Sequence, residues 1–320
     1  MRSLDVVILG RIGYDLYSEE PGVPLKQVRR FSRYLGGSSA NMAVGLSRLG
    51  AQVGMLSCLG DDQLSSFLLD FLNAEKVETS HVKTAPGYLP SLCLTEVCPP
   101  DRFPQVFYRR EPADTMLDLN GGDLDYAASG RMFVTNGTSL CGSPARESAY
   151  LALERAKQSG CRVVVDVDYR AMSWRNPEEA GLAIRLALPF VDILIGNPLE
   201  LKLVAGVDHL DRATAKLRNA GVPILVSKLG ELGTRVLAAD DTMFLPPYTV
   251  DVVTTIGAGD GFASGFLYAM LRELPLLECL HYGNAAAGIV VSRLSCSEAM
   301  PMIAEVEQMI RQQRDRQVHA

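Results

Sequence analysis

The sequence lacks a long hydrophobic run, a C-x-x-C pair and an excess of positive charge. A helix that crosses a membrane needs about 20 consecutive apolar residues, and the first apolar run, at residues 6–9, is too short even for the core of a signal sequence. The seven cysteines are scattered, mostly in apolar segments, a pattern typical of buried, reduced thiols. We therefore expect a cytoplasmic protein without a membrane partner.

Three common ligand-binding signatures are also absent. No G-x-x-x-x-G-K-[ST] occurs, which excludes a P-loop enzyme. No G-x-G-x-x-G follows the first apolar run, which argues against a dinucleotide-binding fold, and no G-x-S-x-G supplies the nucleophile of an α/β-hydrolase. The formal net charge of -6 makes nucleic acid a poor candidate for the main partner, whereas a small anion needs only a local basic pocket.

The chain of 320 residues alternates short apolar runs with helical patterns, and its 48% hydrophobic and 21% charged residues are ordinary for a globular protein. Strands that alternate with helices indicate βαβ units. We therefore predict an α/β fold with a mostly parallel central sheet covered on both faces. The expected strands lie at residues 6–10, 53–59, 132–136, 162–167, 193–196 and 223–228, and the expected helices at 62–77, 147–160, 178–190, 211–221 and 301–316.

Two early segments interrupt this alternation. Residues 11–35 are polar and contain two prolines, and residues 86–110 contain two β-rich runs separated by a Pro-Pro-Asp-Arg turn. The second segment predicts an antiparallel hairpin. We interpret both segments as insertions that form a small β-sheet lid on an α/β core of residues 1–10, 36–85 and 111–320.

The strongest chemical motif is Gly257-Ala258-Gly259-Asp260, which precedes a long apolar helical pattern. Small residues let a ligand approach the backbone, and the first N–H groups of a helix attract anions. Asp260 falls in the first turn, where its carboxylate is suited to accept a proton from a hydroxyl group that attacks phosphorus. Taken alone, the same residues also fit an ordinary helix start with an acidic first turn.

A second set of small and polar residues lies near the N-terminus. Gly36, Gly37, Ser38 and Asn41 open another helical pattern, so that a ligand can approach the backbone and the amide of Asn41 can bind hydroxyl groups. Asp15 follows the first strand, a position suited to binding sugar hydroxyls. The alternative for the helix is an ordinary start capped by serine.

Two further motifs follow predicted strands. Asn197 and Glu200 fit either a water-mediated Mg²⁺ site with phosphates or a plain helix start with proline in its first position. Lys228, Gly230 and Gly233 fit either a phosphate-binding turn or a simple hairpin turn. Neither motif decides the function by itself.

In their order along the chain, these motifs resemble those of the ribokinase-like (PfkB) sugar kinases, and the resemblance covers essentially the whole chain. It implies a ribokinase-like three-layer sandwich, ATP and Mg²⁺ as cofactors, and transfer of the γ-phosphoryl group to a sugar hydroxyl. It also implies that Asp260 is the catalytic base. The other implied roles are an anion hole for Gly257, Ala258 and Gly259; sugar contacts for Asp15, Gly36, Gly37, Ser38 and Asn41; nucleotide contacts for Asn197, Lys228, Gly230, Gly233, Asn284 and Ala287; and Mg²⁺ contacts for Asn197 and Glu200.

Three details resemble the branch of the family that phosphorylates 5-dehydro-2-deoxygluconate in myo-inositol breakdown: the segments 10–17, 37–41 and 166–170 with the tryptophan that follows. The resemblance implies that the terminal hydroxyl of a sugar acid receives the phosphoryl group. Arg11, Arg109 and Arg170 are available to capture its carboxylate, or are solvated surface charges. Open alternatives are a kinase for 2-keto-3-deoxygluconate, fructose or ribose, and a non-catalytic sugar sensor.

The resemblance also bears on a monovalent cation and on the oligomeric state. Many relatives have aspartate where Thr254 stands, beside a monovalent cation, so the resemblance does not extend to a K⁺ requirement. Lids in this family often pair between subunits, and by analogy we expect a possible homodimer through the lid.

Overall fold

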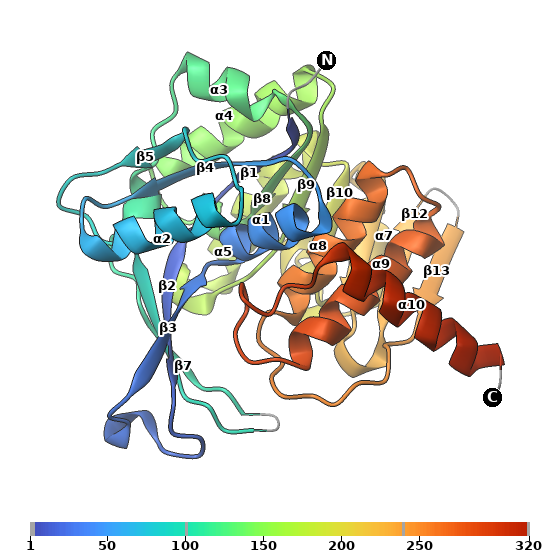
Figure 1. The fold of residues 1–320 in the computed structure, drawn as a ribbon. Helices are drawn as coiled ribbons and strands as arrows, with labels where there is room; N and C mark the ends of the chain where they lie inside the picture. Colours follow the sequence, from blue (N-terminus) through green and yellow to red (C-terminus); the bar gives the residue numbers. More distant parts are fainter. Residues whose placement is uncertain (1–3, 100–101, 239–240, 319–320) are drawn as a thin grey trace.

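The computed structural model describes residues 4–99, 102–238 and 241–318, and a large sheet forms its centre (Figure 1). The strands lie in the order β13-β12-β11-β10-β9-β8-β1-β4-β5. Those from β11 to β5 run parallel, whereas β12 and β13 pair antiparallel at one side. Their bounds are β1 (Leu4–Leu9), β4 (Val53–Leu59), β5 (Val82–Thr84), β8 (Gly130–Asn136), β9 (Arg162–Asp166), β10 (Ile193–Gly196), β11 (Ile224–Lys228), β12 (Thr234–Ala238) and β13 (Asp241–Leu245).

Helices cover both faces of this sheet, which confirms the predicted α/β architecture with three layers. Successive side chains of β1 point to opposite faces: Val6 and Ile8 enter one core cluster, and Val7 and Leu9 the other. The first face carries α1 (Ser38–Leu49), α2 (Gln63–Ala74), α8 (Ala258–Leu271) and α9 (Leu276–Val291), with α10 (Ile303–Val318) packed on α9. The second carries α3 (Gly121–Ala127), α4 (Ala145–Gln158), α5 (Pro177–Ala187), α6 (Pro198–Ala205) and α7 (Leu210–Asn219).

A second, four-stranded sheet projects from the large one (Figure 1). Its order is β3 (Phe31–Gly36), β2 (Gly13–Ser18), β6 (Ser91–Thr95) and β7 (Gln105–Tyr108). β6 and β7 form the predicted antiparallel hairpin, and β2 joins the two segments by pairing with both β3 and β6. Gly36, which we assigned to the core, pairs with Gly13 as the last residue of β3.

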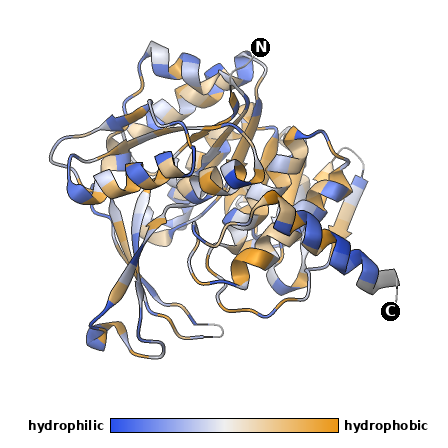
Figure 2. Ribbon diagram, in the orientation of Figure 1, coloured by the Kyte–Doolittle hydropathy of each residue, from blue (hydrophilic) through white to orange (hydrophobic). Residues whose placement is uncertain are grey.

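The hydropathy of the chain follows these layers. The central strands are mostly hydrophobic and the far end of α10 is mostly hydrophilic (Figure 2), as expected when strands are covered on both faces. Within the described ranges, no helix combines the length and the apolar character that spanning a bilayer requires. The predicted helix at 178–190 stops at Ala187 and continues as a 3₁₀ turn that contains Pro189, because proline cannot donate the helical hydrogen bond.

Candidate active site

A cavity of about 450 Å³ lies between the small sheet and the carboxyl edge of the large sheet. Parallel α/β sheets bind ligands at this edge, where the strands end and are followed by loops and the first turns of helices. β9 ends here at Asp166 and β11 at Lys228, and α1 and α8 begin here. The predicted residues that line the cavity are Asp15, Gly37, Ser38, Asn41, Arg170, Asn197, Glu200, Lys228, Gly230, Gly257, Ala258, Gly259 and Asp260.

The start of α8 has the features of an anion site. Gly257 is the N-cap, with φ at 82°, and no side chain of the described residues caps the helix. This φ favours glycine, and an added Cβ would also lie 3.1 Å from the sulfur of Cys296. Because the first N–H groups of a helix have no acceptor within the helix, those of Ala258 and Gly259 are available to a ligand.

Asp260 joins the starts of the two helices. One carboxylate oxygen accepts a hydrogen bond from Ser38 Oγ at 2.9 Å, and the other accepts one from Asn41 Nδ2 at 2.8 Å. Burial, and next the charge of Asp168, raise the pKa of Asp260 to about 6, although both hydrogen bonds and Arg170 act in the opposite direction. The carboxylate is thus ionised at neutral pH and more basic than an ordinary aspartate.

The start of α1 faces the same carboxylate. The N-cap of this helix is Gly37, with φ at 93° and no side-chain hydrogen bond, so the alternative of a serine-capped helix is wrong. Ser38 instead occupies the first helical position and donates to Asp260. A Cβ at Gly36 would lie 2.2 Å from the carboxylate of Asp15, so glycine is required where β3 passes this side chain.

Two buried oxygens of the lining residues have no hydrogen-bond partner among the described residues: Oδ1 of Asp15 and Oδ1 of Asn41. Burial raises the pKa of Asp15 to about 6, while Arg11 and Arg170 lower it. Buried polar atoms normally find partners. Unpaired acceptors at a cavity wall therefore fit a ligand that brings hydroxyl donors, such as a sugar.

The three candidate arginines have different positions. Arg170 lines the cavity, contacts Asp168 at 2.9 Å and keeps 42% of its side chain exposed. Arg11 also lines it and donates to Ser91. Arg109 does not: its guanidinium forms two hydrogen bonds with Asp114, and its side chain is only 4% exposed. The structure therefore does not bring Arg109, which we predicted to bind the substrate, to this cavity, because the Asp114 carboxylate already binds its guanidinium.

Lys228 places a cation beside the start of α8. Its ammonium group contacts Asp166 at 2.8 Å and would lie 3.2 Å from a Cβ added at Gly259. Burial alone would lower the pKa of Lys228, but the charges of Asp166 and Glu200 raise it above its usual range. The lysine therefore stays charged, and with the free N–H groups of α8 it fits the phosphates of a nucleotide.

Asn197 and Glu200 form a reciprocal capping box at the start of α6. The Glu200 carboxylate accepts from the N–H groups of Asn197 and Tyr169, at 2.7 and 3.0 Å. Each oxygen keeps a further lone pair, and Glu200 lines the cavity. Across the described ranges no group of three or more acidic, histidine or cysteine side chains is placed to hold a metal. The pair thus fits Mg²⁺ held through water and phosphates rather than in a protein cage.

Other predicted residues lie outside the cavity lining. Gly233 ends the turn after β11, where an added Cβ would lie 2.3 Å from the Leu245 carbonyl oxygen. Both ends of the Asn284 side-chain amide already form hydrogen bonds: its oxygen accepts from the Thr234 hydroxyl group, and its nitrogen donates to the Pro246 carbonyl oxygen. Ala287 packs, partly buried, against the first core cluster.

The cavity also includes residues that we did not predict as site residues. Asp166 and Asp168 sit at and just beyond the end of a buried strand, a position that marks a candidate site in a parallel sheet. This signal was present in the sequence. Gln105, Phe107 and Cys296 carry no local signal, because β7 and the loop before α10 reach the cavity only through the tertiary fold.

A three-layer α/β fold, with an anion-binding helix start and a basic carboxylate beside unpaired polyol acceptors, has the features of a sugar kinase. The chain belongs to the pfkB family of carbohydrate kinases, whose profile matches residues 3–303. It is 35% identical over 321 residues to the 5-dehydro-2-deoxygluconokinase of Clostridium tetani and 36% identical over 320 residues to that of Geobacillus kaustophilus. These alignments cover 98% of this chain and 95% and 96% of the two relatives.

Solved structures agree on the fold, which confirms the ribokinase-like architecture. The aminoimidazole riboside kinase of Salmonella enterica, complexed with aminoimidazole riboside and an ATP analog, has a TM-score of 0.82 at 25% identity and covers 96% of this chain and 99% of its own. An E. coli protein assigned as a ribokinase II, in complex with ATP and Mg²⁺, has a TM-score of 0.87 at 21% identity and covers 97% and 99%.

Proposed function

We propose that this protein is an ATP-dependent, Mg²⁺-requiring kinase that phosphorylates the terminal hydroxyl group of 5-dehydro-2-deoxygluconate. The observation that carries the proposal is the position of Asp260, which faces the cavity beside the uncapped start of α8 and is held by two side chains of α1. The names of the curated relatives support this substrate, and they support a place in myo-inositol catabolism.

Asp260 accepts the proton of the substrate hydroxyl group while the oxygen of that hydroxyl group attacks the γ-phosphorus of ATP. The new O–P bond forms as the bond to the departing ADP breaks. Ser38 and Asn41 fix the carboxylate of Asp260 in one orientation. The acceptor oxygen is therefore already oriented toward the reacting hydroxyl group when the substrate binds. A pKa near 6 keeps this base ionised at neutral pH.

Groups other than Asp260 stabilise the negative charge on the phosphoryl group that is transferred. The backbone at Gly257, Ala258 and Gly259 forms the anion hole, and the Lys228 ammonium lies beside it. Gly230 leaves the turn after β11 open toward the nucleotide. Asn197 and Glu200 would hold Mg²⁺ through water, and the bound ion neutralises charge on the phosphates.

A sugar acid is favoured over a neutral sugar because two arginines line the cavity. Arg170 keeps donors free beyond its contact with Asp168, and Arg11 lines the same cavity, where it donates to Ser91. A planar guanidinium binds carboxylates with two parallel hydrogen bonds. A kinase for fructose or ribose has no need of such cations, whereas a kinase for 2-keto-3-deoxygluconate would use them equally.

The small sheet serves as the lid in this proposal, with residues 11–35 and 86–110 closing over the sugar to exclude water. Its edge strand β7 exposes Val106 and Tyr108 to 45% and 64%. Exposed apolar side chains on an unpaired edge support a homodimer formed through the lids. Seven free thiols support a reducing, cytoplasmic location.

A substrate panel tests the proposal. ADP release is followed with ATP and Mg²⁺ against 5-dehydro-2-deoxygluconate, 2-keto-3-deoxygluconate, fructose and ribose. We expect the highest kcat/KM with the first compound. A higher value with 2-keto-3-deoxygluconate or with a neutral sugar would reassign the substrate, and no ADP release with any compound would favour the sugar sensor.

A further inference from the structure

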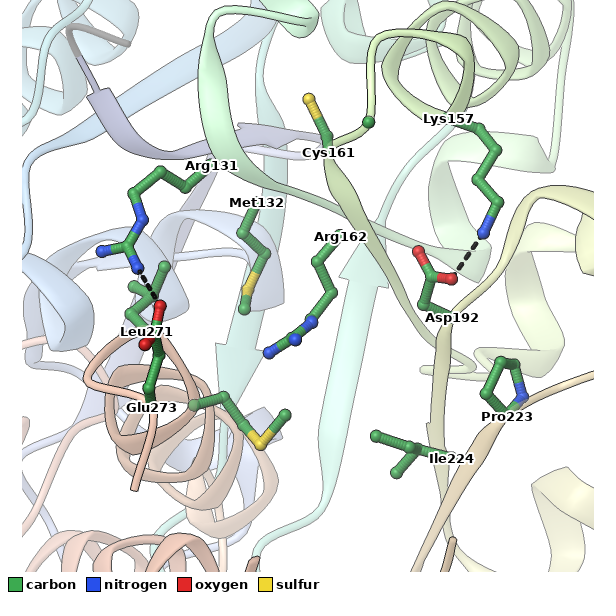
Figure 3. Close-up of a pocket in the computed structure, with 12 residues that line it drawn as sticks. Arg131, Met132, Lys157, Cys161, Arg162, Asp192, Pro223, Ile224, Leu271 and Glu273 are labelled. Carbon is green, nitrogen blue, oxygen red and sulfur yellow. Dashed lines mark hydrogen bonds and ion pairs between the residues drawn. The ribbon is translucent and has the colours of Figure 1, made fainter. Parts of the chain in front are cut away.

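A second cavity lies at the opposite, amino edge of the large sheet, where β8, β9 and β11 begin (Figure 3). Its volume is about 600 Å³, within the range of small-molecule sites. The ends of α4 and α8 close it, through Lys157 and Met270. It shares no lining residue with the candidate active site.

Three cations line this cavity, and two of them are paired. Arg131 contacts Glu273 at 3.2 Å on one side, and Lys157 forms an ion pair with Asp192 on the other. Arg162 projects between these two pairs (Figure 3). Within the described part of the chain its guanidinium has no hydrogen-bond or ion-pair partner, so its donors are open to a ligand.

The remaining wall is apolar. Met132, Ile224 and Met270 line the cavity, and Met132 lies next to Arg162 in Figure 3. Arg162 is exposed to solvent in this cavity, and its guanidinium presents a rigid fork of donors that matches carboxylate or phosphate. Arg131 also lies 3.7 Å from Asp5, so among the described residues Arg162 is the lining cation that no carboxylate pairs with.

We propose that this cavity is a binding site for a small organic anion that carries phosphate or carboxylate groups. Arg162 binds one anionic group in the bidentate manner, and Arg131 and Lys157 lie on either side to receive a second. The apolar wall covers the body of the ligand. The site is independent of the proposed kinase activity, since none of its residues contacts the carboxyl-edge cavity.

Isothermal titration calorimetry tests this proposal, with inorganic pyrophosphate and citrate as probes for the two anion chemistries. Mg²⁺ is omitted and ADP is present at saturation, so that the active site is occupied. We expect one binding event with at least one probe. Arg162→Ala should weaken it about tenfold or more, as expected when a charge-assisted hydrogen bond is lost.

Two further variants serve as a control and as a test of the opposite effect on binding. Arg212→Ala removes an exposed cation from α7, outside this cavity, and should leave the affinity unchanged. Glu273→Gln removes one of the two carboxylates that pair with Arg131, the other being Asp5, and should tighten binding. Equal affinity of the wild type and Arg162→Ala, or no heat with either probe at millimolar concentration, would overturn the proposal. Kinase activity without the probes should be the same in all these variants.

Discussion

Lys228 and Asp166, at the carboxyl edge of the large sheet, have side chains that are 19% and 2% exposed, whereas those of Arg131 and Glu273 at the amino edge are 45% and 81% exposed. Both are ion pairs with similar separations, 2.8 and 3.2 Å. A buried pair loses hydration that its mutual attraction only partly restores, while an exposed pair loses little and gains little.

Of these two ion pairs, the one at the carboxyl edge therefore carries the larger cost of removing charge from water. At the carboxyl edge, burial holds Asp15 and Asp260 at a pKa of about 6 and keeps charged groups inside the cavity. Such arrangements are common at sites that do chemistry. At the amino edge, the charged side chains of Arg131 and Glu273 are exposed to solvent beside the second cavity. Substitutions at the carboxyl edge should therefore have larger effects than substitutions at the amino edge.

Asp260→Asn should lower kcat by about 100-fold or more, because the proton acceptor is lost while shape is kept. The apparent affinities for sugar and ATP should change little. Burial raises the pKa of Asp260, so the ionised group opposes folding above about pH 6, and the variant should be at least as stable as the wild type. Steady-state kinetics and urea unfolding measure both effects, with Asp251→Asn, an exposed site, as the control.

Lys228→Met should destabilise the protein by about 3–5 kcal/mol, because Asp166 is left as a buried charge without its partner. Chemical denaturation measures the loss. Adding Asp166→Asn in the same chain should restore much of the stability but not the activity. A single Lys228→Met variant as stable as the wild type would show that the pair is not the buried element we describe.

Arg170→Gln should raise KM for the sugar acid about tenfold or more and leave KM for a neutral sugar nearly unchanged. The matched control is Arg109→Gln. Arg109 is bound to Asp114 outside the cavity, so its loss should lower stability without changing KM. If the two variants had the same kinetic effect, Arg170 would not be the group that distinguishes sugar acids.

Arg131→Ala, at the amino edge, should change the free energy of unfolding by less than about 1 kcal/mol, because its ion pairs are exposed. Turnover with ATP and the sugar acid should match the wild type. A marked loss of kcat would mean that the amino edge is coupled to the chemistry, and would remove the contrast drawn above.

The strands of the sheet interior were predictable because they are nearly continuous apolar runs. The expected ranges 53–59 and 193–196 coincide with β4 and β10. β13 was missed because its side chains are mostly exposed and give no apolar run, and β5 because it has only three residues. Pairing in the sheet, rather than propensity, determines such peripheral strands.

The candidate site was predictable where its chemistry lies at helix starts and strand ends. Glycine-rich motifs located Gly37 and Gly257 without reference to tertiary structure, because both adopt positive φ at an N-cap. Sequence could not separate Arg170 from Arg109, since only the fold shows that Asp114 occupies the second. Nor could it reveal Cys296, which reaches the cavity from a distant loop.

The pH dependence of kcat/KM for the sugar acid, at saturating ATP and Mg²⁺, shows whether Asp260 is the catalytic base. Asp260 must be ionised to accept a proton, and its pKa is about 6. Activity should therefore fall about tenfold per pH unit below that value and level off above it. Asp15→Asn should keep this limb and Asp260→Asn should abolish it. A wild-type profile that stays flat through pH 6, or the same limb in Asp260→Asn, would contradict the account.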